Sequence, residues 1–408
     1  MSGEPESHSC TGELKSHAYI VSNRRMAFVG CVAFFTLIYH IGLNFSSPML
    51  STVFHSITRD ENFLEISPTL VQSTNSKEIF STFYSRYDDQ KIYLARNNLS
   101  DAELLVLASH AAKRKTCRDG GRIAFLFITR GDIPLEPLWQ RYFEGYIELY
   151  SIYVHAAPGF KFPKNSLFSG KEIPSKDVRK LSMDLVDALR TLTAYALLDD
   201  TACNSWFVLA CESTVPIRSF SLSYAYLTNS KISFVDSFHP AREWLLDGWK
   251  MEPELSRQQL RKGELWMCFQ RKHAGMIVGE QYFYKKFMID CKGACFPDEE
   301  YVQTMLSIYD PQGIANRSVM FVNWTSPHSS SPYTYNSGII TPMLIQNFQN
   351  LTLDLMGMHQ DIGGGAGVQS STCLYNGRSQ SPCFLFARKF AAEAVDVLMQ
   401  MPSSVLGY

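Results

Sequence analysis

The chain has 408 residues, with 38 Lys and Arg against 39 Asp and Glu, which gives a formal net charge of −1. It lacks the excess of positive charge that is typical of nucleic-acid-binding proteins, so we expect no nucleic-acid partner. Hydrophobic residues make up 46% of the chain and aromatic residues 13%. This composition excludes extended disorder and is sufficient for a large core. The 24 Gly and 18 Pro are too few for a fibrous protein.

An apolar run near the N-terminus predicts a membrane anchor. Residues 26–43 form a segment of 18 residues with two clearly polar members, and a helix of about 20 apolar residues crosses a bilayer. Arg24 and Arg25 directly precede it. The positive-inside rule therefore predicts a cytosolic tail over residues 1–25 and a lumenal remainder. A cleaved signal peptide is the alternative, but the run is longer than a typical signal-peptide core and starts late in the chain.

Sequons and cysteines agree with a lumenal location. Asn-x-Ser/Thr sequons, which are glycosylation acceptors in secreted proteins, begin at Asn98, Asn316, Asn323 and Asn350. A further sequon abuts the predicted membrane segment. Eight cysteines follow that segment, and in an oxidising lumen they can pair, although several of them can equally be buried thiols. We favour a disulfide between Cys373 and Cys383, because a turn lies between them.

The remaining chain divides into a stem and a folded domain. Residues 44–118 have mixed polarity and are interpreted as a stem plus an entry helix. After residue 120, apolar runs typical of strands alternate with segments that have helical spacing. We predict strands at 122–131, 150–156, 205–211 and 231–238, with helices at 135–146, 182–198 and 219–227. Continuous apolar strands that alternate with helices predict an α/β fold with an open, mostly parallel sheet and helices on both faces.

The second half continues this alternation. We predict strands at 264–270 and 318–324, helices at 272–290 and 297–306, and a short apolar segment at 383–390 that is followed by an amphipathic helix at the C-terminus. The helix that starts at Pro297 has acids in its first turn, which suits a helix N-terminus. We expect Asp298 to cap it.

Most standard catalytic motifs are absent. There is no Walker loop, no His-Glu-x-x-His and no Gly-x-Ser-x-Gly. Cys291 and Cys295 have no companion ligands at zinc spacing, so a local disulfide or two free thiols are favoured over a metal site. The sequence also contains no Asp-x-Asp.

Seven segments carry a resemblance to a known family. They are residues 125–143, 150–160, 188–200, 206–220, 261–274, 295–306 and 382–390. In this order they resemble plant members of the core-2/I-branching β-1,6-N-acetylglucosaminyltransferase-like group, glycosyltransferase family 14. The resemblance implies a nucleotide-sugar transferase of the GT-A fold over residues 119–408. It also implies an inverting, metal-independent reaction.

Sugar transfer requires a base and a group that stabilises the departing diphosphate. Glu299 matches the base of the family's Pro-Asp-Glu motif, although on composition alone it is an acid in a helix first turn. Lys389 matches the family's phosphate-binding Lys, with a snorkelling Lys as the alternative. Animal members carry a second cation where this chain has Ser370. Arg388 or Arg378 is the candidate replacement.

Four further residues are candidates for substrate binding. Arg130 and His155 follow the first two strands, where an open sheet forms its nucleotide crevice; ordinary loop polarity is the alternative. Trp324 lies where relatives place an aromatic residue against the acceptor, and burial in the core is the alternative. Arg261, with Lys262 beside it, is a candidate contact for the acceptor.

We therefore expect an inverting glycosyltransferase that moves a sugar, with a GlcNAc-like donor favoured, from a UDP-sugar to a hydroxyl of a glycan or glycoprotein. It needs no metal and no cofactor besides the donor, and residues 26–43 anchor it in the Golgi membrane as a type II protein. The alternative is a non-catalytic Golgi scaffold or glycan-binding protein. Leu189 and Ser370 replace charged residues of relatives and favour that alternative. The oligomeric state is left open.

Overall fold

The structure is a computed structural model of the whole chain. It describes residues 99–114, 117, 120–199, 201–240, 250–293, 295–324, 331–351, 373–378 and 382–408, all of which belong to one compact unit, residues 66–408. The predicted tail (1–25), the predicted anchor (26–43) and most of the predicted stem lie outside the described residues. In the part of the chain that is described, no helix is long and apolar enough to cross a bilayer.

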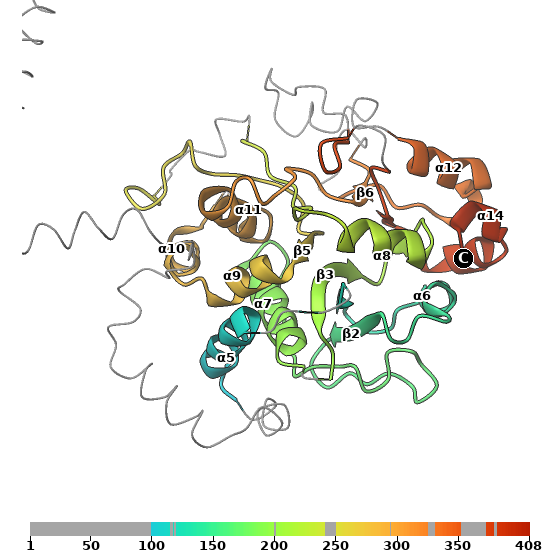
Figure 1. Cartoon of the computed structure of the whole chain (residues 1–408), viewed down its shortest axis with the longest axis horizontal. Coiled ribbons are helices and arrows are strands. Elements are labelled where there is room, and N and C mark those ends of the chain that lie inside the picture. The colour runs from blue at the N-terminus through green and yellow to red at the C-terminus, as the bar shows by residue number, and fades with distance from the viewer. Residues whose placement is uncertain are drawn as a thin grey trace, which may run out of the picture. The chain divides into compact units, whose positions relative to one another are not determined.

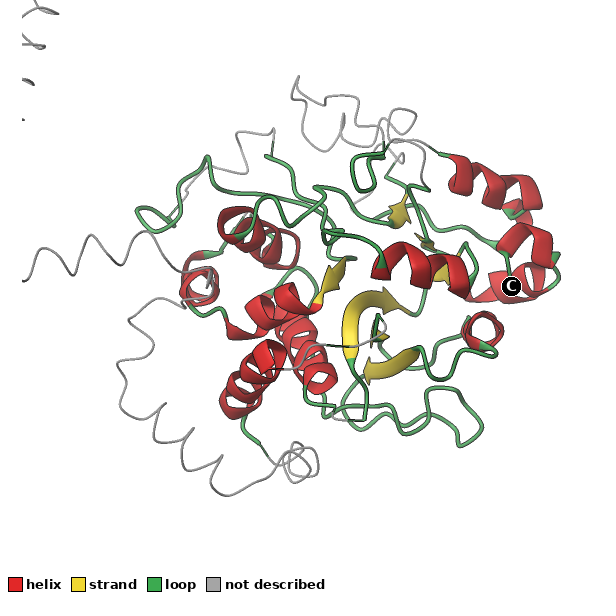
Figure 2. Ribbon diagram, in the orientation of Figure 1, coloured by secondary structure: helices red, strands yellow, loops and turns green. Residues whose placement is uncertain are grey.

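A four-stranded sheet lies at the centre of the described residues (Figures 1 and 2). In spatial order its strands are β2 (Tyr150–His155), β1 (Arg122–Ile128), β3 (Asn204–Cys211) and β5 (Cys268–Gln270). Strand β1 pairs in parallel with β2 and β3, whereas β5 pairs antiparallel with β3. The prediction of a mixed α/β fold with a parallel-rich sheet is confirmed.

Helices cover both faces of this sheet. Successive side chains of a strand point to opposite faces, and in β1 both sets are apolar, so both faces must be buried. Ala124 and Leu126 of β1 belong to one core cluster, and Phe125 and Phe127 belong to another. Figure 1 shows the first face beside α5, α7 and α9 and the second beside α6 and α8. The bounds are Asp101–Arg114 for α5, Met183–Leu197 for α7, Arg271–Gly279 for α9, Glu136–Phe143 for α6 and Phe220–Thr228 for α8.

The long helix predicted over 272–290 is wrong. The structure has two helices, α9 and α10 (Tyr282–Asp290), separated at Glu280, whose backbone is extended. The Glu280 carboxylate accepts hydrogen bonds from the N–H groups of Phe283 (2.8 Å) and Tyr284 (3.0 Å). It thus satisfies donors that the first turn of α10 leaves free, and this stabilises a new helix start.

A second, three-stranded sheet corrects the prediction of a single sheet. Its order is β4 (Val215–Pro216), β7 (Phe386–Arg388) and β6 (Met320–Val322). Strand β7 runs parallel to β6 and antiparallel to β4. Val215, Phe321 and Ala387 of this sheet belong to a third core cluster, together with apolar residues of α12 (Pro342–Asn350), α13 (Val395–Met399) and α14 (Ser403–Leu406). Short 3-10 turns lie at Ser337–Ile339 and Ala392–Ala394.

The strand predicted over 231–238 is also wrong. Three of its residues form isolated bridges to three different partners: Ser233 to Ile314, Phe234 to Cys268 and Phe238 to Lys262. No continuous ladder forms, because each partner belongs to a different segment. The strand predicted over 264–270 shortens to β5, and the helix predicted at 297–306 is confirmed as α11 (Pro297–Tyr309).

Six of the described cysteines form disulfides. The favoured pair Cys373–Cys383 is confirmed. Cys291 and Cys295 form a disulfide. Of the two alternatives, a local disulfide or two free thiols, the first is therefore correct. A third disulfide joins Cys117, before β1, to Cys203, before β3. Cys211 and Cys268 are buried free thiols.

Candidate active site

The candidate site lies at the C-terminal edge of the parallel strands. The chain leaves β3 at Cys211, and the segment after β7 approaches it there, since the Phe390 N–H donates to the Ser213 carbonyl (2.9 Å). Lys389 immediately precedes Phe390. The crevice beyond the C-terminal ends of parallel strands is where open α/β sheets bind their ligands.

Five carboxyl groups gather next to this edge. We call them the acidic cluster: Asp236, Glu264, Asp298, Glu299 and Glu300. Burial raises the pKa of Asp236, Glu264, Asp298 and Glu300 to about 7, and the negative charge of Glu299 contributes to each increase. A buried carboxylate loses hydration, so its protonated form is favoured. Near neutral pH each of these four carboxyls is therefore partly protonated.

Glu299 lies in the first turn of α11, which begins with Pro297. Its side chain is 23% exposed, and its Oε2 accepts a hydrogen bond from the Nζ of Lys262. The expected cap at Asp298 is wrong. Phe296 is the N-cap residue and makes no side-chain cap bond, because Asp298 is already inside the helix. Among the described residues, the buried Oδ1 of Asp298 has no hydrogen-bond partner.

Three cations lie on the other side of the site. We call them the cationic group: Lys180, Arg388 and Lys389. Burial lowers the pKa of Lys389, and the positive charges of Arg388 and Lys180 lower it further. The Arg388 guanidinium lies 4.1 Å from the ring centroid of Trp266, a cation–π arrangement. Its buried Nε has no hydrogen-bond partner among the described residues. Converging positive charges of this kind favour an anionic ligand.

Glu264 connects the two sides. The Arg388 charge lowers its pKa and the Glu299 charge raises it, so its carboxyl lies within electrostatic range of both. Its Oε1 accepts a hydrogen bond from the Trp324 indole N–H. The sequence analysis missed Glu264 and Lys180. A charged residue at the start of the apolar segment 264–270 was the available signal for Glu264. Nothing in the sequence distinguishes Lys180 from other exposed lysines.

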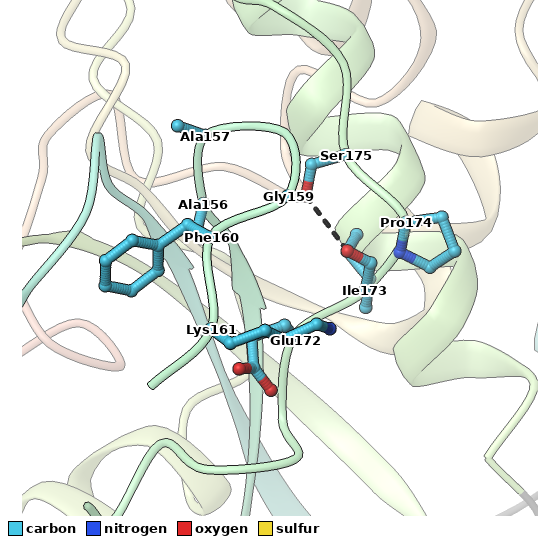
Figure 3. Close-up of a pocket in the computed structure, with 9 residues that line it drawn as sticks. All are labelled: Ala156, Ala157, Gly159, Phe160, Lys161, Glu172, Ile173, Pro174 and Ser175. Atoms are coloured by element: carbon cyan, nitrogen blue, oxygen red, sulfur yellow. Dashed lines mark hydrogen bonds between the residues drawn. The ribbon is translucent and has the colours of Figure 1, made fainter. Parts of the chain in front are cut away.

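A pocket of about 230 Å³ lies beyond the end of β2. Figure 3 shows residues 156–161 and 172–175 facing each other across it. His155, at the end of β2, is buried beside the pocket, and its Nε2 accepts a hydrogen bond from the Lys176 N–H (3.4 Å). Burial lowers the pKa of His155, so the imidazole is neutral near pH 7. Lys180 of the cationic group follows the last lining residue, Ser175, by five positions in the chain.

Comparison with known proteins identifies the family to which the chain belongs. The family model "Branch: Core-2/I-Branching enzyme" matches residues 123–349, which is more than half of the chain. The chain belongs to the Core-2/I-branching enzyme family. It is also 30% identical to "Glycosyltransferase BC10" of Oryza sativa subsp. japonica over 309 residues, which cover 67% of this chain and 74% of that protein. The resemblance seen in the sequence is confirmed, and this Core-2/I-branching chain is a glycosyltransferase.

The fold thus brings together several residues that the sequence singled out. Glu299, Trp324, Arg388 and Lys389 lie around Glu264. Arg388 and Lys389 fall after the range that the family model matches, and the structure places them near Glu264, which lies within that range.

Three other predicted residues make no described contact with this group. Arg130 is exposed after β1. The Arg261 guanidinium donates to the carbonyls of Gln258 (2.7 Å) and Leu260 (2.9 Å), which belong to its own turn. Arg378 lies in an exposed turn, where its N–H donates to the Tyr375 carbonyl (2.9 Å). Their substrate contacts stay predictions.

Of the two positions that differ from relatives, Leu189 and Ser370, the structure describes one. Leu189 is fully buried in the core around α7, where its side chain packs among apolar residues. Ser370 lies outside the described residues.

The sequons differ in accessibility. Asn316 and Asn350 are exposed, whereas Asn98 lies outside the described residues. Asn323 is half-buried and its amide donates to the Tyr335 hydroxyl (2.7 Å). Glycosylation at all four stays a prediction.

One potential metal-ligand cluster occurs among the described residues. It consists of Cys291, Cys295 and Glu300. The two cysteines form a disulfide with each other, so their sulfurs are not thiolates and offer no zinc-type ligand set.

Proposed function

We propose that this Core-2/I-branching chain transfers a sugar, with a GlcNAc-like donor favoured, from a UDP-sugar to a hydroxyl group of a glycan acceptor, with inversion and without a metal ion. The proposed location is the Golgi lumen, with residues 26–43 as the membrane anchor. The observation that carries the proposal is the placement of a partly exposed carboxylate, Glu299, and the cations Arg388 and Lys389 around one shared residue, Glu264.

The chemistry follows from these two kinds of group. Glu299 takes the proton of the acceptor hydroxyl while that oxygen attacks the anomeric carbon of the donor. The bond between the anomeric carbon and the UDP oxygen breaks, and the electron pair leaves with UDP. A single displacement inverts the anomeric configuration. Arg388 and Lys389 stabilise the negative charge that develops on the diphosphate.

The placement of the donor has independent support. The buried, neutral His155 directly precedes the pocket-lining Ala156, and Lys180 follows the last lining residue, Ser175, by five positions. A nucleoside in this pocket would direct its diphosphate towards the cationic group. The indole of Trp324, held at its N–H by Glu264, offers a ring face to a sugar.

The metal-free part of the proposal rests on charge. Metal-dependent transferases use acidic ligands for the cation, and the sequence contains no Asp-x-Asp. We assign to Arg388 and Lys389, at the end of β7, the positive charge that a metal ion supplies in metal-dependent transferases.

A donor panel tests the proposal. We would record the melting temperature of the purified full-length chain with UDP-GlcNAc, UDP-Xyl, UDP-GlcA and UDP-Gal, and assay transfer to glycan acceptors with and without EDTA. We expect one UDP-sugar at about 100 times its Kd to raise the melting temperature by several degrees, and transfer from it to survive EDTA. No shift with any donor contradicts the UDP-sugar assignment, and loss of transfer in EDTA contradicts the metal-free mechanism.

A further inference from the structure

Lys262 is a buried cation inside the acidic side of the site. The residue is 7% exposed, and its backbone N–H and carbonyl exchange hydrogen bonds of 2.8 Å with Phe238. Its Nζ lies 4.4 Å from the ring centroid of Phe296, the N-cap residue of α11. A buried lysine without an anionic partner is costly, and the partner here is the Oε2 of Glu299.

The backbone next to Lys262 is fixed to the same turn of α11. The Gly263 N–H donates to the Glu299 carbonyl (2.9 Å). A Cβ on Gly263 would collide with the backbone carbonyl of Asp236, so glycine is required for this close approach. Glu299 is thus held twice: the Gly263 N–H contacts its backbone carbonyl, and the Lys262 ammonium contacts its carboxylate. The two contacts limit the positions that the Glu299 carboxylate can take.

The charges around Glu299 make a cation necessary. Asp236, Glu264, Asp298 and Glu300 approach it from three segments of the chain, and each interacts unfavourably with its negative charge. Lys262 is the cation that the structure places in direct contact with it. Arg388 acts from farther away, on Glu264. A carboxylate among four carboxyls becomes protonated more easily unless a positive charge offsets its neighbours.

We propose that Lys262 is the positioning residue of the sugar transfer: it holds one oxygen of Glu299, offsets the surrounding negative charge, and leaves the other oxygen to accept the proton of the acceptor hydroxyl. This rests on the proposed function, in which Glu299 is the base. Among the described residues, Glu299 receives no other side-chain hydrogen bond than the one from Lys262, so its Oε1 has no competing side-chain donor. Lys262 itself is too buried to serve as a principal sugar contact.

The pH dependence of transfer tests this role. We would compare Lys262→Met, Lys262→Arg and the wild type, with Lys286→Met as the control. Lys286 is another lysine paired with carboxylates, Glu254 and Asp290, although its side chain is partly exposed. In Lys262→Met the acid limb of kcat/KM is expected to move to higher pH by about one to three units. Arginine should restore most of the wild-type profile, and Lys286→Met should leave it unchanged.

Other outcomes are equally decisive. If Lys262→Met lowers kcat/KM by the same factor at every pH, or if arginine restores nothing, Lys262 has only a structural role and the proposal is overturned. Should methionine prevent folding, as judged by circular dichroism, Lys262→Gln replaces it as a neutral residue that retains hydrogen bonding.

A measurement that needs no activity separates this proposal from the proposed function. Glutamate labelled with ¹³C at the side-chain carboxyl reports protonation by NMR in the full-length chain, and Glu299→Gln assigns the signal of Glu299. Its titration midpoint should rise in Lys262→Met by the same one to three units. A rise without sugar transfer by the wild type would reject the proposed function while keeping the contact. Transfer by the wild type with an unchanged midpoint would reject the role of Lys262.

Discussion

The acidic cluster and the cationic group meet at Glu264, which belongs to the acidic cluster, and they have opposite electrostatic requirements. In the acidic cluster, burial raises the pKa of four carboxyls to about 7, and Lys262 contacts the fifth, Glu299. In the cationic group, like charges face each other and Arg388 stacks on Trp266. A base must be able to gain a proton, whereas a phosphate contact must keep its charge. The net charge of −1 conceals this local separation.

Removing the base should have the largest effect. Glu299→Gln keeps the size of the side chain but cannot take a proton, so we expect kcat to fall by about 10²- to 10⁴-fold. The increase in melting temperature caused by UDP should persist, because the cationic group is intact. The control is Glu254→Gln, another carboxylate paired with a lysine. Unchanged kcat in Glu299→Gln would remove this residue from the mechanism.

Removing a cation should have the next largest effect and should act on binding. In Lys389→Met we expect the Kd for UDP to rise by about 10- to 100-fold, since a lost contact to a charged group is worth about 1.5–3 kcal/mol. The Kd for uridine, which has no phosphate, should stay the same. Isothermal titration calorimetry measures both, with Lys285→Met on the exposed side of α10 as the control. Equal weakening of UDP and uridine would argue against a phosphate contact.

The smallest effect concerns stability. Folded Asp236, Asp298 and Glu300 have pKa values of about 7, above their ordinary values of 3.8 to 4.5. The folded chain therefore binds more protons than the unfolded chain in this range, and the free energy of unfolding falls as the pH rises towards and through 7. His273, whose pKa burial lowers from 6.5 to about 4, has the opposite effect below pH 6.5.

Above pH 6.5 His273 no longer affects the pH dependence of stability, and the effect of the three carboxyls remains. We therefore expect the melting temperature to fall between about pH 6.5 and about pH 8. Each carboxyl should contribute on the order of 1 kcal/mol over this interval. Glu300→Gln should reduce the dependence of the melting temperature on pH, because glutamine does not titrate. Its amide oxygen can still accept a hydrogen bond from the Phe296 N–H, as the Glu300 carboxylate does (3.2 Å), so the local contact is kept. The exposed Glu148→Gln serves as control. A flat melting temperature would show that these carboxyls do not titrate in the folded chain as described.

The main sheet was predictable because its signals are local. The apolar runs that became β1, β2 and β3 are continuous, and the intervening helices have apolar residues at helical spacing. The second sheet was not predictable. Its strands have two or three residues, and β7 pairs with β4, which is far away in the sequence. The same holds for residues 231–238, whose bridges depend on three separate segments.

The candidate site divides in the same way. Motif resemblance found Glu299 and Lys389, and family membership is confirmed. Glu264, Lys180 and the contact of Lys262 with Glu299 became visible in three dimensions, because their partners come from other parts of the chain. A charged side chain has no distinguishing sequence signal until the groups that face it are known.

The sequence by itself determined the α/β class, the order of the main elements, the favoured disulfide and the family, because residue spacing and short motifs encode them. The tertiary structure decided the second sheet, the break between α9 and α10, and the distribution of charge around Glu264. Those features depend on burial and on contacts between distant segments, and burial is what changes the proton affinity of a carboxyl and the strength of an ion pair.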